Sequence, residues 1–143
     1  MQEINTRLEQ GTGGVLMMID IDDFKEINDV FGHLAGDTVL KVLSDRIRES
    51  FGGQSIMGRA GGDEFVVFAE KTASRDSIGQ SAQKFCEIVT QPVMDIPGCS
   101  ITVSIGIAQS PDNGSSYSAL VRSADQALYA RKKNSKNGYV FAG

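Results

Sequence analysis

The sequence predicts an α+β fold in which several helices pack around a mainly antiparallel sheet. Short apolar runs of strand length alternate with longer stretches whose apolar residues recur at helical spacing. Two of the short runs are joined by Gly61-Gly62, which is typical of a tight β-hairpin. The 143 residues are 41% hydrophobic and 22% charged, an ordinary globular composition. We therefore expect residues 1–143 to form a single domain with its own core.

Composition and charge argue against several other classes of protein. No apolar run approaches the roughly 20 residues of a membrane span, and residues 1–7 lack the apolar stretch of a signal peptide. The net charge of −4 argues against a general nucleic-acid surface. Cys86 and Cys99 show no Cys-x-x-Cys spacing, so we interpret both as buried thiols. The expected location is the cytoplasm, with no membrane contact by this domain.

The first half of the chain is predicted to contain three helices and three strands. In order, these are a helix within residues 1–10, a strand over 15–20, a short helix from Asp22 or Asp23 to about Val30, a helix over 35–49, and strands over 55–59 and 64–69. In the second and third of these helices, helical spacing places one set of apolar residues on the inner face. The set is Phe24, Ile27 and Val30 in the short helix, and Val39, Leu40, Leu43 and Ile47 in the longer one.

The second half is predicted to contain two long helices and two strands. A helix over 77–90 should bury Ile78, Ala82, Phe85 and Val89. Residues 99–107 alternate between aliphatic and small polar residues, the pattern of a half-buried strand. After a loop over 111–115, the last helix carries an apolar stripe, and a short strand over 139–141 ends the chain; the stripe consists of Tyr117, Leu120, Val121, Ala124 and Leu128.

Acidic residues follow two of the predicted strand ends. Asp20 ends the strand over 15–20, and Asp63 and Glu64 follow Gly61-Gly62 directly. Mg²⁺ prefers oxygen ligands, usually one or two carboxylates together with substrate phosphates, so neighbouring strand ends of this kind predict a metal site. Successive side chains of a strand point to opposite faces, so Asp63 and Glu64 share one site only if the turn is irregular. A solvent-exposed turn is the alternative interpretation of Gly-Gly-Asp on its own.

These acidic residues belong to longer blocks that resemble a known family. The run Gly61-Gly62-Asp63-Glu64-Phe65 resembles the signature of the GGDEF domain, the diguanylate cyclase family. The resemblance extends to residues 20–29, 31–37 and 124–130, in the family's order and spacing. It implies the ferredoxin-like palm of the nucleotidyl cyclases, a mainly antiparallel sheet with surrounding helices and a βααββαβ core.

The resemblance also implies a reaction, cofactors and partners. The family condenses two GTP molecules into cyclic di-GMP and two pyrophosphates, a bacterial second-messenger reaction. It implies two Mg²⁺ or Mn²⁺ ions per active site and an antiparallel homodimer that brings two GTP-loaded half-sites together. It further implies an attached sensor or EAL phosphodiesterase domain, and in some relatives a membrane anchor, in the full-length protein.

Matching positions assign a role to each candidate site residue. Asp20, the backbone carbonyl of Ile21, and Asp63 would hold the metals; Asp63 would also accept the proton of the attacking hydroxyl, with Glu64 assisting. Asn28 and Asp37 would read guanine, His33 would contact the substrate, and Lys25, Lys132 and Lys136 would contact the triphosphate. From the residues alone, His33 also suits a structural role in its Gly-flanked turn, and the lysines near the C-terminus also suit a solvated helix end.

Departures from the family pattern keep a second function open. The segment that usually begins the family's domain has no match here, so we expect the chain to be an excised part of a longer protein. Lys136 stands where the family more often has Arg, and lysine offers a point charge instead of a bidentate fork. The alternative function is a catalytically weak or inactive GTP-binding module that controls an attached domain such as an EAL phosphodiesterase.

Overall fold

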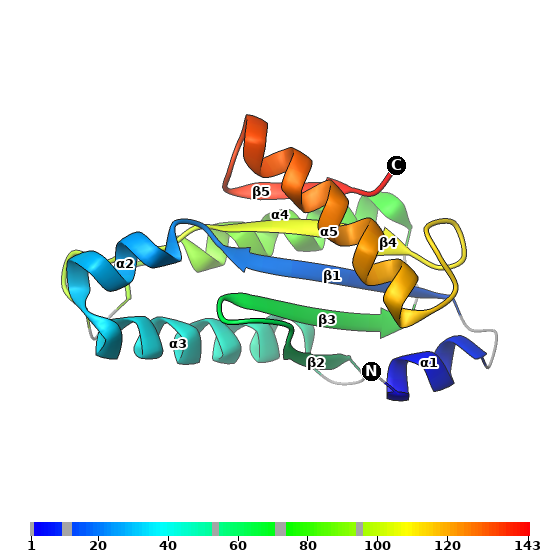
Figure 1. Ribbon diagram of the computed structural model, residues 1–143, viewed down its shortest axis with the longest axis horizontal. Coiled ribbons are helices and arrows are strands. Elements are labelled where there is room, and N and C mark those ends of the chain that lie inside the picture. Colours follow the sequence, from blue (N-terminus) through cyan, green and yellow to red (C-terminus); the bar gives the residue numbers. More distant parts are fainter. Residues whose placement is uncertain (1, 10–12, 53–54, 71–73, 94–95) are drawn as a thin grey trace.

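A five-stranded sheet forms the centre of the computed structural model, which describes residues 2–9, 13–52, 55–70, 74–93 and 96–143 (Figure 1). The strand order is β2-β3-β1-β4-β5, and every neighbouring pair is antiparallel except β4 and β5, which are parallel. In chain order the elements are α1 (Gln2–Glu9), β1 (Gly14–Ile21), α2 (Phe24–Phe31), α3 (His33–Phe51), β2 (Ile56–Arg59), β3 (Glu64–Glu70), α4 (Arg75–Val89), β4 (Val103–Gln109), α5 (Tyr117–Asn134) and β5 (Gly138–Phe141). The expected α+β fold and its βααββαβ core, from β1 to β4, are confirmed.

The central strand β1 is buried on both faces because helices cover both sides of the sheet. Alternate residues of β1 enter two separate apolar clusters: Val15, Met17, Ile19 and Ile21 pack with α2, α3 and α4, whereas Leu16 and Met18 pack with α1 and α5. The same alternation places Asp20 on the α5 side. The charged end of β1 therefore faces the helix that carries Lys132.

The second face of β4 was expected to be exposed, and this expectation was wrong. Every residue of β4 is buried because α5 packs directly across it. Gly106 permits that approach, since a Cβ there would clash with the carbonyl oxygen of Ala124 in α5. Ser104, which suggested a polar outer face, is fully buried and hydrogen-bonded. The strand is also shorter at its start than the predicted 99–107, although it extends to Gln109.

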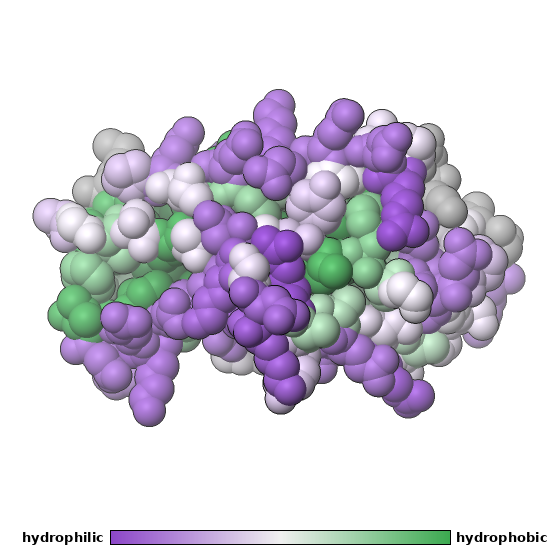
Figure 2. Space-filling model, turned by 90° about the horizontal axis from the view of Figure 1, so that it is seen from above, coloured by the Kyte–Doolittle hydropathy of each residue, from purple (hydrophilic) through white to green (hydrophobic). Residues whose placement is uncertain are grey.

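Helix α2 has the predicted extent, but two of the side-chain roles predicted for it are not observed. Ile27 is buried and Phe24 packs against the core, but Val30 is 66% exposed, because α2 lies beyond the end of the sheet and packs mainly against α3 (Figure 1). Asp23 occupies the N-cap position with φ of 56°, yet its side chain makes no capping hydrogen bond. Figure 2 shows a hydrophobic area at the end of the molecule where α2 lies in Figure 1.

The other predicted elements are confirmed, with longer helices than expected. Helices α3 and α4 begin two residues before the predicted starts, and their predicted inner residues are buried or packed against the core. Ser74 caps α4 by accepting a hydrogen bond from the Ser77 N–H at 3.2 Å. Cys86 and Cys99 are both buried, as expected. Among the residues that the structure describes, no helix has the length and apolarity that a membrane span requires.

Candidate active site

The candidate site begins at Asp20, which the register of the sheet places directly opposite Glu64 on β3. Directly opposed residues of an antiparallel pair point to the same face, so both carboxyl groups lie on the α5 side. Asp125 and Lys132 are two helical turns apart on α5, and both line the same cavity as Asp20 and Glu64. Strand β1, strand β3 and helix α5 thus place charged side chains around one point.

The turn before β3 adds Asp63 to this group. Strand β3 begins only at Glu64, so Asp63 lies in the turn, where strand alternation does not apply. The Asp63 carbonyl oxygen accepts a hydrogen bond from the Ile21 N–H at 3.2 Å, which fastens the turn to the end of β1. Arg59 fastens its other side by donating to the Gly62 carbonyl oxygen at 2.5 Å. The turn is therefore irregular, and Asp63 and Glu64 both address the site at Asp20.

Burial and neighbouring carboxyl groups raise the pKa values of Asp20 and Glu64 at this site. Burial raises the pKa of Asp20 above its ordinary value; Lys132 counteracts this increase, while the neighbouring Asp63 adds to it. Burial also raises the pKa of Glu64, and the charges of Asp20, Asp125 and Asp63 raise it further. Clustered carboxylates that are partly removed from water are unfavourable without a cation between them.

One carboxylate oxygen suggests where such a cation would bind. Asp20 Oδ2 accepts a hydrogen bond from Lys132 Nζ at 2.6 Å, whereas Asp20 Oδ1 is buried and has no hydrogen-bond partner in the described part of the chain. Within that part, no three His, Cys, Asp or Glu side chains form a ready-made metal cage. The arrangement instead fits Mg²⁺, which usually takes one or two protein carboxylates and completes its coordination with water and substrate phosphates.

The two lysines assigned to the triphosphate are paired with aspartates in this structure. Lys132 contacts Asp20 as described, and its Nζ is also 3.9 Å from Asp22 Oδ1. Lys136 Nζ lies 2.7 Å from Asp23 Oδ1, and this hydrogen bond raises the pKa of Lys136. The lysines therefore lie at the carboxyl end of β1, beside the start of α2, where backbone N–H groups suit phosphate binding.

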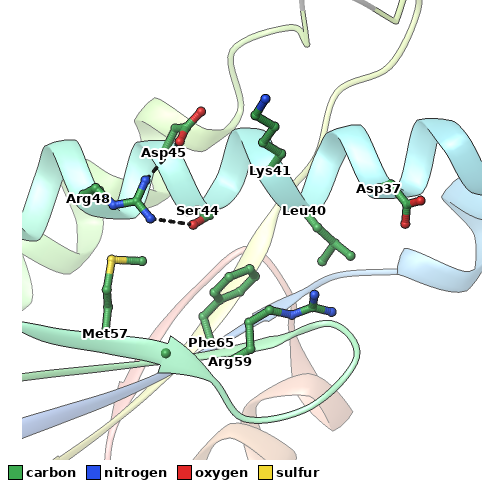
Figure 3. A pocket seen from close by; sticks show the side chains of 10 residues that line it. Asp37, Leu40, Lys41, Ser44, Asp45, Arg48, Met57, Arg59 and Phe65 are labelled. Carbon is green, nitrogen blue, oxygen red and sulfur yellow. Dashed lines mark hydrogen bonds and ion pairs between the residues drawn. The ribbon is translucent and has the colours of Figure 1, made fainter.

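The two residues assigned to guanine lie where α2 packs against α3. Asn28 Oδ1 rests against Gly36 so closely that a Cβ at position 36 would clash with it, and Asp37 is the next residue along α3. Asp37 lines a cavity of about 610 Å³ between α3 and the β2-β3 hairpin. Figure 3 shows Leu40 of α3 and Phe65 and Arg59 of the hairpin pointing toward one another in this cavity. An apolar floor with polar groups at the rim suits a nucleobase.

The glycine turn separates this cavity from the carboxylates. Phe65 points to the α3 side of the sheet and Glu64 to the α5 side, as alternation along β3 requires. A Cβ placed on Gly62 would meet nothing within 4 Å, and one on Gly61 would meet only the Glu64 side chain. A ligand with a base in the cavity and phosphates near Lys132 would pass over an open Gly61-Gly62 backbone.

Two predicted substrate contacts are exposed, and three further charged residues lie near the site without a predicted site role. Lys25 and His33 are exposed at the starts of α2 and α3. Sequence reasoning gave no site role to Asp125, although its spacing of seven residues from Lys132 on a helix could have indicated a shared face. It also gave none to Arg59, and it treated Asp22 only as a possible helix cap.

The raised pKa of Glu64 predicts how a neutral substitution would change stability. A raised folded-state pKa means that Glu64 contributes stability below its ordinary pKa near 4.5 and loses that contribution as the pH rises through the raised value. Glu64→Gln should therefore unfold at a higher temperature than the wild type at pH 7 without metal, and the difference should shrink toward pH 4. Circular dichroism melts across this pH range would measure it.

Glu49→Gln is the matched control for that experiment, because Glu49 is an exposed carboxylate near the far end of α3. A stabilisation by Glu64→Gln that stays constant from pH 4 to pH 7 would contradict the electrostatic explanation.

Comparisons with known proteins agree with this fold. The model of the family "Diguanylate cyclase, GGDEF domain" matches residues 1–138. The chain is 34% identical over 141 residues to the bifunctional diguanylate cyclase/cyclic di-GMP phosphodiesterase MucR of Pseudomonas aeruginosa, covering 98% of this chain and 20% of MucR. It is also 34% identical over 138 residues to the cyclic di-GMP phosphodiesterase NbdA of the same organism, covering 96% of this chain and 17% of NbdA.

A solved structure gives the same result. The crystal structure of the GGDEF domain of TpbB from Pseudomonas aeruginosa superposes with a TM-score of 0.89 at 33% identity, covering 99% of this chain and 89% of that one. The fold is thus the α+β palm of the nucleotidyl cyclases. The chain belongs to the GGDEF domain family, the family of the diguanylate cyclases. It spans about a fifth of the length of the two curated relatives described above.

Proposed function

We propose that this domain is an active diguanylate cyclase that condenses two GTP molecules into cyclic di-GMP and releases two pyrophosphates. The observation that carries the proposal is the convergence of Asp20, Asp63 and Glu64, with Asp20 Oδ1 buried and unpartnered among the described residues. A purely structural domain would gain no stability from clustering these carboxyl groups, because each charged carboxylate makes ionisation of its neighbours less favourable.

The proposed roles are those that matching positions in the family imply, and the arrangement of the residues supports them. Asp20, Asp63 and the Ile21 carbonyl would hold Mg²⁺ or Mn²⁺, two ions per site, which neutralise charge on the phosphates when bound. Asp63 lies in the turn before β3 and would accept the proton of the attacking 3′-hydroxyl, with Glu64 assisting. Lys25, Lys132 and Lys136 would hold the triphosphate, with His33 as a further contact.

The guanine base would occupy the cavity between α3 and the hairpin. The Asn28 carboxamide and the Asp37 carboxylate would read its N–H donors, and Leu40 and Phe65 would cover its faces. Each protomer would supply one GTP, so the reaction requires an antiparallel homodimer with two such sites facing one another. In the full-length protein, an attached sensor or EAL domain would control this pairing.

Product analysis with GTP and Mg²⁺ or Mn²⁺ tests the proposal. Mass spectrometry should detect cyclic di-GMP, and GTP should not be replaceable by ATP. Because two loaded protomers must meet, specific activity should rise about tenfold for a tenfold increase in dilute protein. Fusion to a leucine zipper should remove that dependence. Absence of product at every protein concentration, in the fused and unfused protein alike, would contradict the proposal.

A second candidate function is a GTP-binding regulatory module, which the identity to the phosphodiesterase NbdA favours. Both functions use the same pocket, so GTP binding alone does not separate them. Tight binding of GTP to the zipper-fused protein without formation of product would favour the regulatory module.

A further inference from the structure

Asp22 is a buried carboxylate that stands in the sequence between Asp20 and Asp23, the partners of Lys132 and Lys136, and it has no role in the assignments above. Its side chain is 1% exposed, so its charge is almost completely removed from water. Three hydrogen bonds compensate it: Ser104 Oγ donates to Oδ1 at 2.7 Å, Thr102 Oγ1 donates to Oδ2 at 2.6 Å, and the Asn137 N–H donates to Oδ2 at 3.0 Å. A buried carboxylate is tolerated only with such a set of partners.

The partners of Asp22 come from two other segments, which meet the end of β1 at the site. Thr102 directly precedes β4 and Ser104 is the second residue of that strand, and the Asp22 N–H itself donates to the Thr102 carbonyl oxygen at 2.9 Å. Asn137 lies in the turn between α5 and β5, where it adopts a left-handed φ of 55°. One carboxylate therefore joins the carboxyl end of β1, the start of β4 and the turn that follows α5.

Both phosphate-binding lysines lie next to these connections. Lys136 immediately precedes Asn137, so the hydrogen bond from Asn137 to Asp22 fixes the backbone from which the Lys136 side chain extends. Lys132 Nζ lies between two carboxylates, 2.6 Å from Asp20 Oδ2 and 3.9 Å from Asp22 Oδ1. When Lys132 turns from Asp20 to a phosphate, the charge of Asp22 still faces it.

We propose that Asp22 is a positioning residue for the triphosphate, which acts by holding Lys132 and Lys136 in place without touching the substrate. This inference rests on the proposed function, because it concerns the GTP site. Its specific content is that Asp22 contributes to binding of the phosphates and not to binding of guanine. If Asp22 had only a structural role, its substitution would change the stability of the fold and leave the ratio of triphosphate affinity to GMP affinity unaltered.

The test compares the affinities of two ligands in the presence of Mg²⁺. Calorimetry would give the Kd of a nonhydrolysable GTP analogue and of GMP for the wild type and for Asp22→Asn. Asparagine has the shape of aspartate, and its carbonyl oxygen can accept the hydrogen bonds of Thr102 and Asn137, while Ser104 can rotate to accept from its amide. The substitution thus keeps the connections and removes the charge that faces Lys132.

We expect Asp22→Asn to lower the preference for the triphosphate over GMP by about tenfold. This is the lower end of the loss seen when a residue that orients metal ligands is substituted. GMP affinity should change by less than about twofold, since no guanine contact is lost. The control is Ser123→Ala, which removes a part-buried hydroxyl bonded to the Asn113 carbonyl oxygen, outside the candidate site. It should lower stability without changing the ratio of the two affinities.

A second variant keeps the test decisive if Asp22→Asn does not fold. Ser104→Ala removes one donor to Asp22 Oδ1, the oxygen nearest Lys132, and should also lower the triphosphate preference. An unchanged preference in the folded variants, with a wild type that clearly prefers the triphosphate, would overturn the positioning role and leave the proposed function standing. A wild type without any preference for the triphosphate would overturn both.

Discussion

The Asp63→Asn protein is expected to form cyclic di-GMP at least about 100-fold more slowly than the wild type, because one substitution removes a proposed metal ligand and the proposed proton acceptor. The fold should be unaffected. The contact that Asp63 makes with β1 uses its backbone carbonyl oxygen, which asparagine retains. Product formation would be measured by chromatography under saturating GTP and Mg²⁺, and folding by thermal melts without metal.

Asp112→Asn is the control for this change, because Asp112 is an exposed aspartate in the segment before α5. It removes the same charge from the protein without touching the site, so its activity should equal that of the wild type. If Asp63→Asn retains full activity, the catalytic assignment of this residue is wrong.

The Gly36→Ala protein is expected to lose about 100-fold of its preference for GTP over ATP. The added Cβ would occupy the position of Asn28 Oδ1 and displace the carboxamide from the proposed base site. A site that reads a base through hydrogen bonds discriminates strongly only while its polar groups stay in place. Competition binding of the two nucleotides would measure the preference.

The same substitution should not weaken the helix, since alanine is favoured over glycine within a helix by about 0.5–1 kcal/mol. Gly36→Ala should therefore lower the preference for GTP over ATP without lowering the free energy of unfolding. Asn28→Ala is the matched variant, because it removes the same carboxamide without a clash and should give a similar loss. Full retention of the preference in Gly36→Ala would show that Asn28 does not read the base from its present position.

The sequence was sufficient to predict most of the fold because its patterns are local. The apolar run of β1, the glycine hairpin and the helical stripes each depend on neighbouring residues, and the structure confirms them. The exposure of Val30 and the burial of Ser104 depend on what lies across space. Alternation along β4 could not show that a helix covers its second face, because the small residues that admit α5 also resemble a solvent-facing set.

The candidate site was predictable to a similar extent. The sequence pointed to Asp20, Asp63 and Glu64, and the structure brings all three together. It did not indicate the pairing of Lys132 with Asp20 or of Lys136 with Asp23, since each pair joins residues more than 100 positions apart. The burial of Asp22 depends on Thr102, Ser104 and Asn137 in the same way.

The pairing of one lysine with several carboxyl groups affects the order in which ligands can enter. Asp20, Asp22, Asp63 and Glu64 together outnumber Lys132, so we expect a negative potential at the carboxyl end of β1 before any ligand binds. A bare triphosphate would meet repulsion there, because like charges in a partly buried site oppose association. Nucleotide that arrives already complexed with its divalent cation brings the compensating charge with it. If the domain binds GTP as proposed, we therefore expect it to favour nucleotide that arrives with its divalent cation over the bare triphosphate.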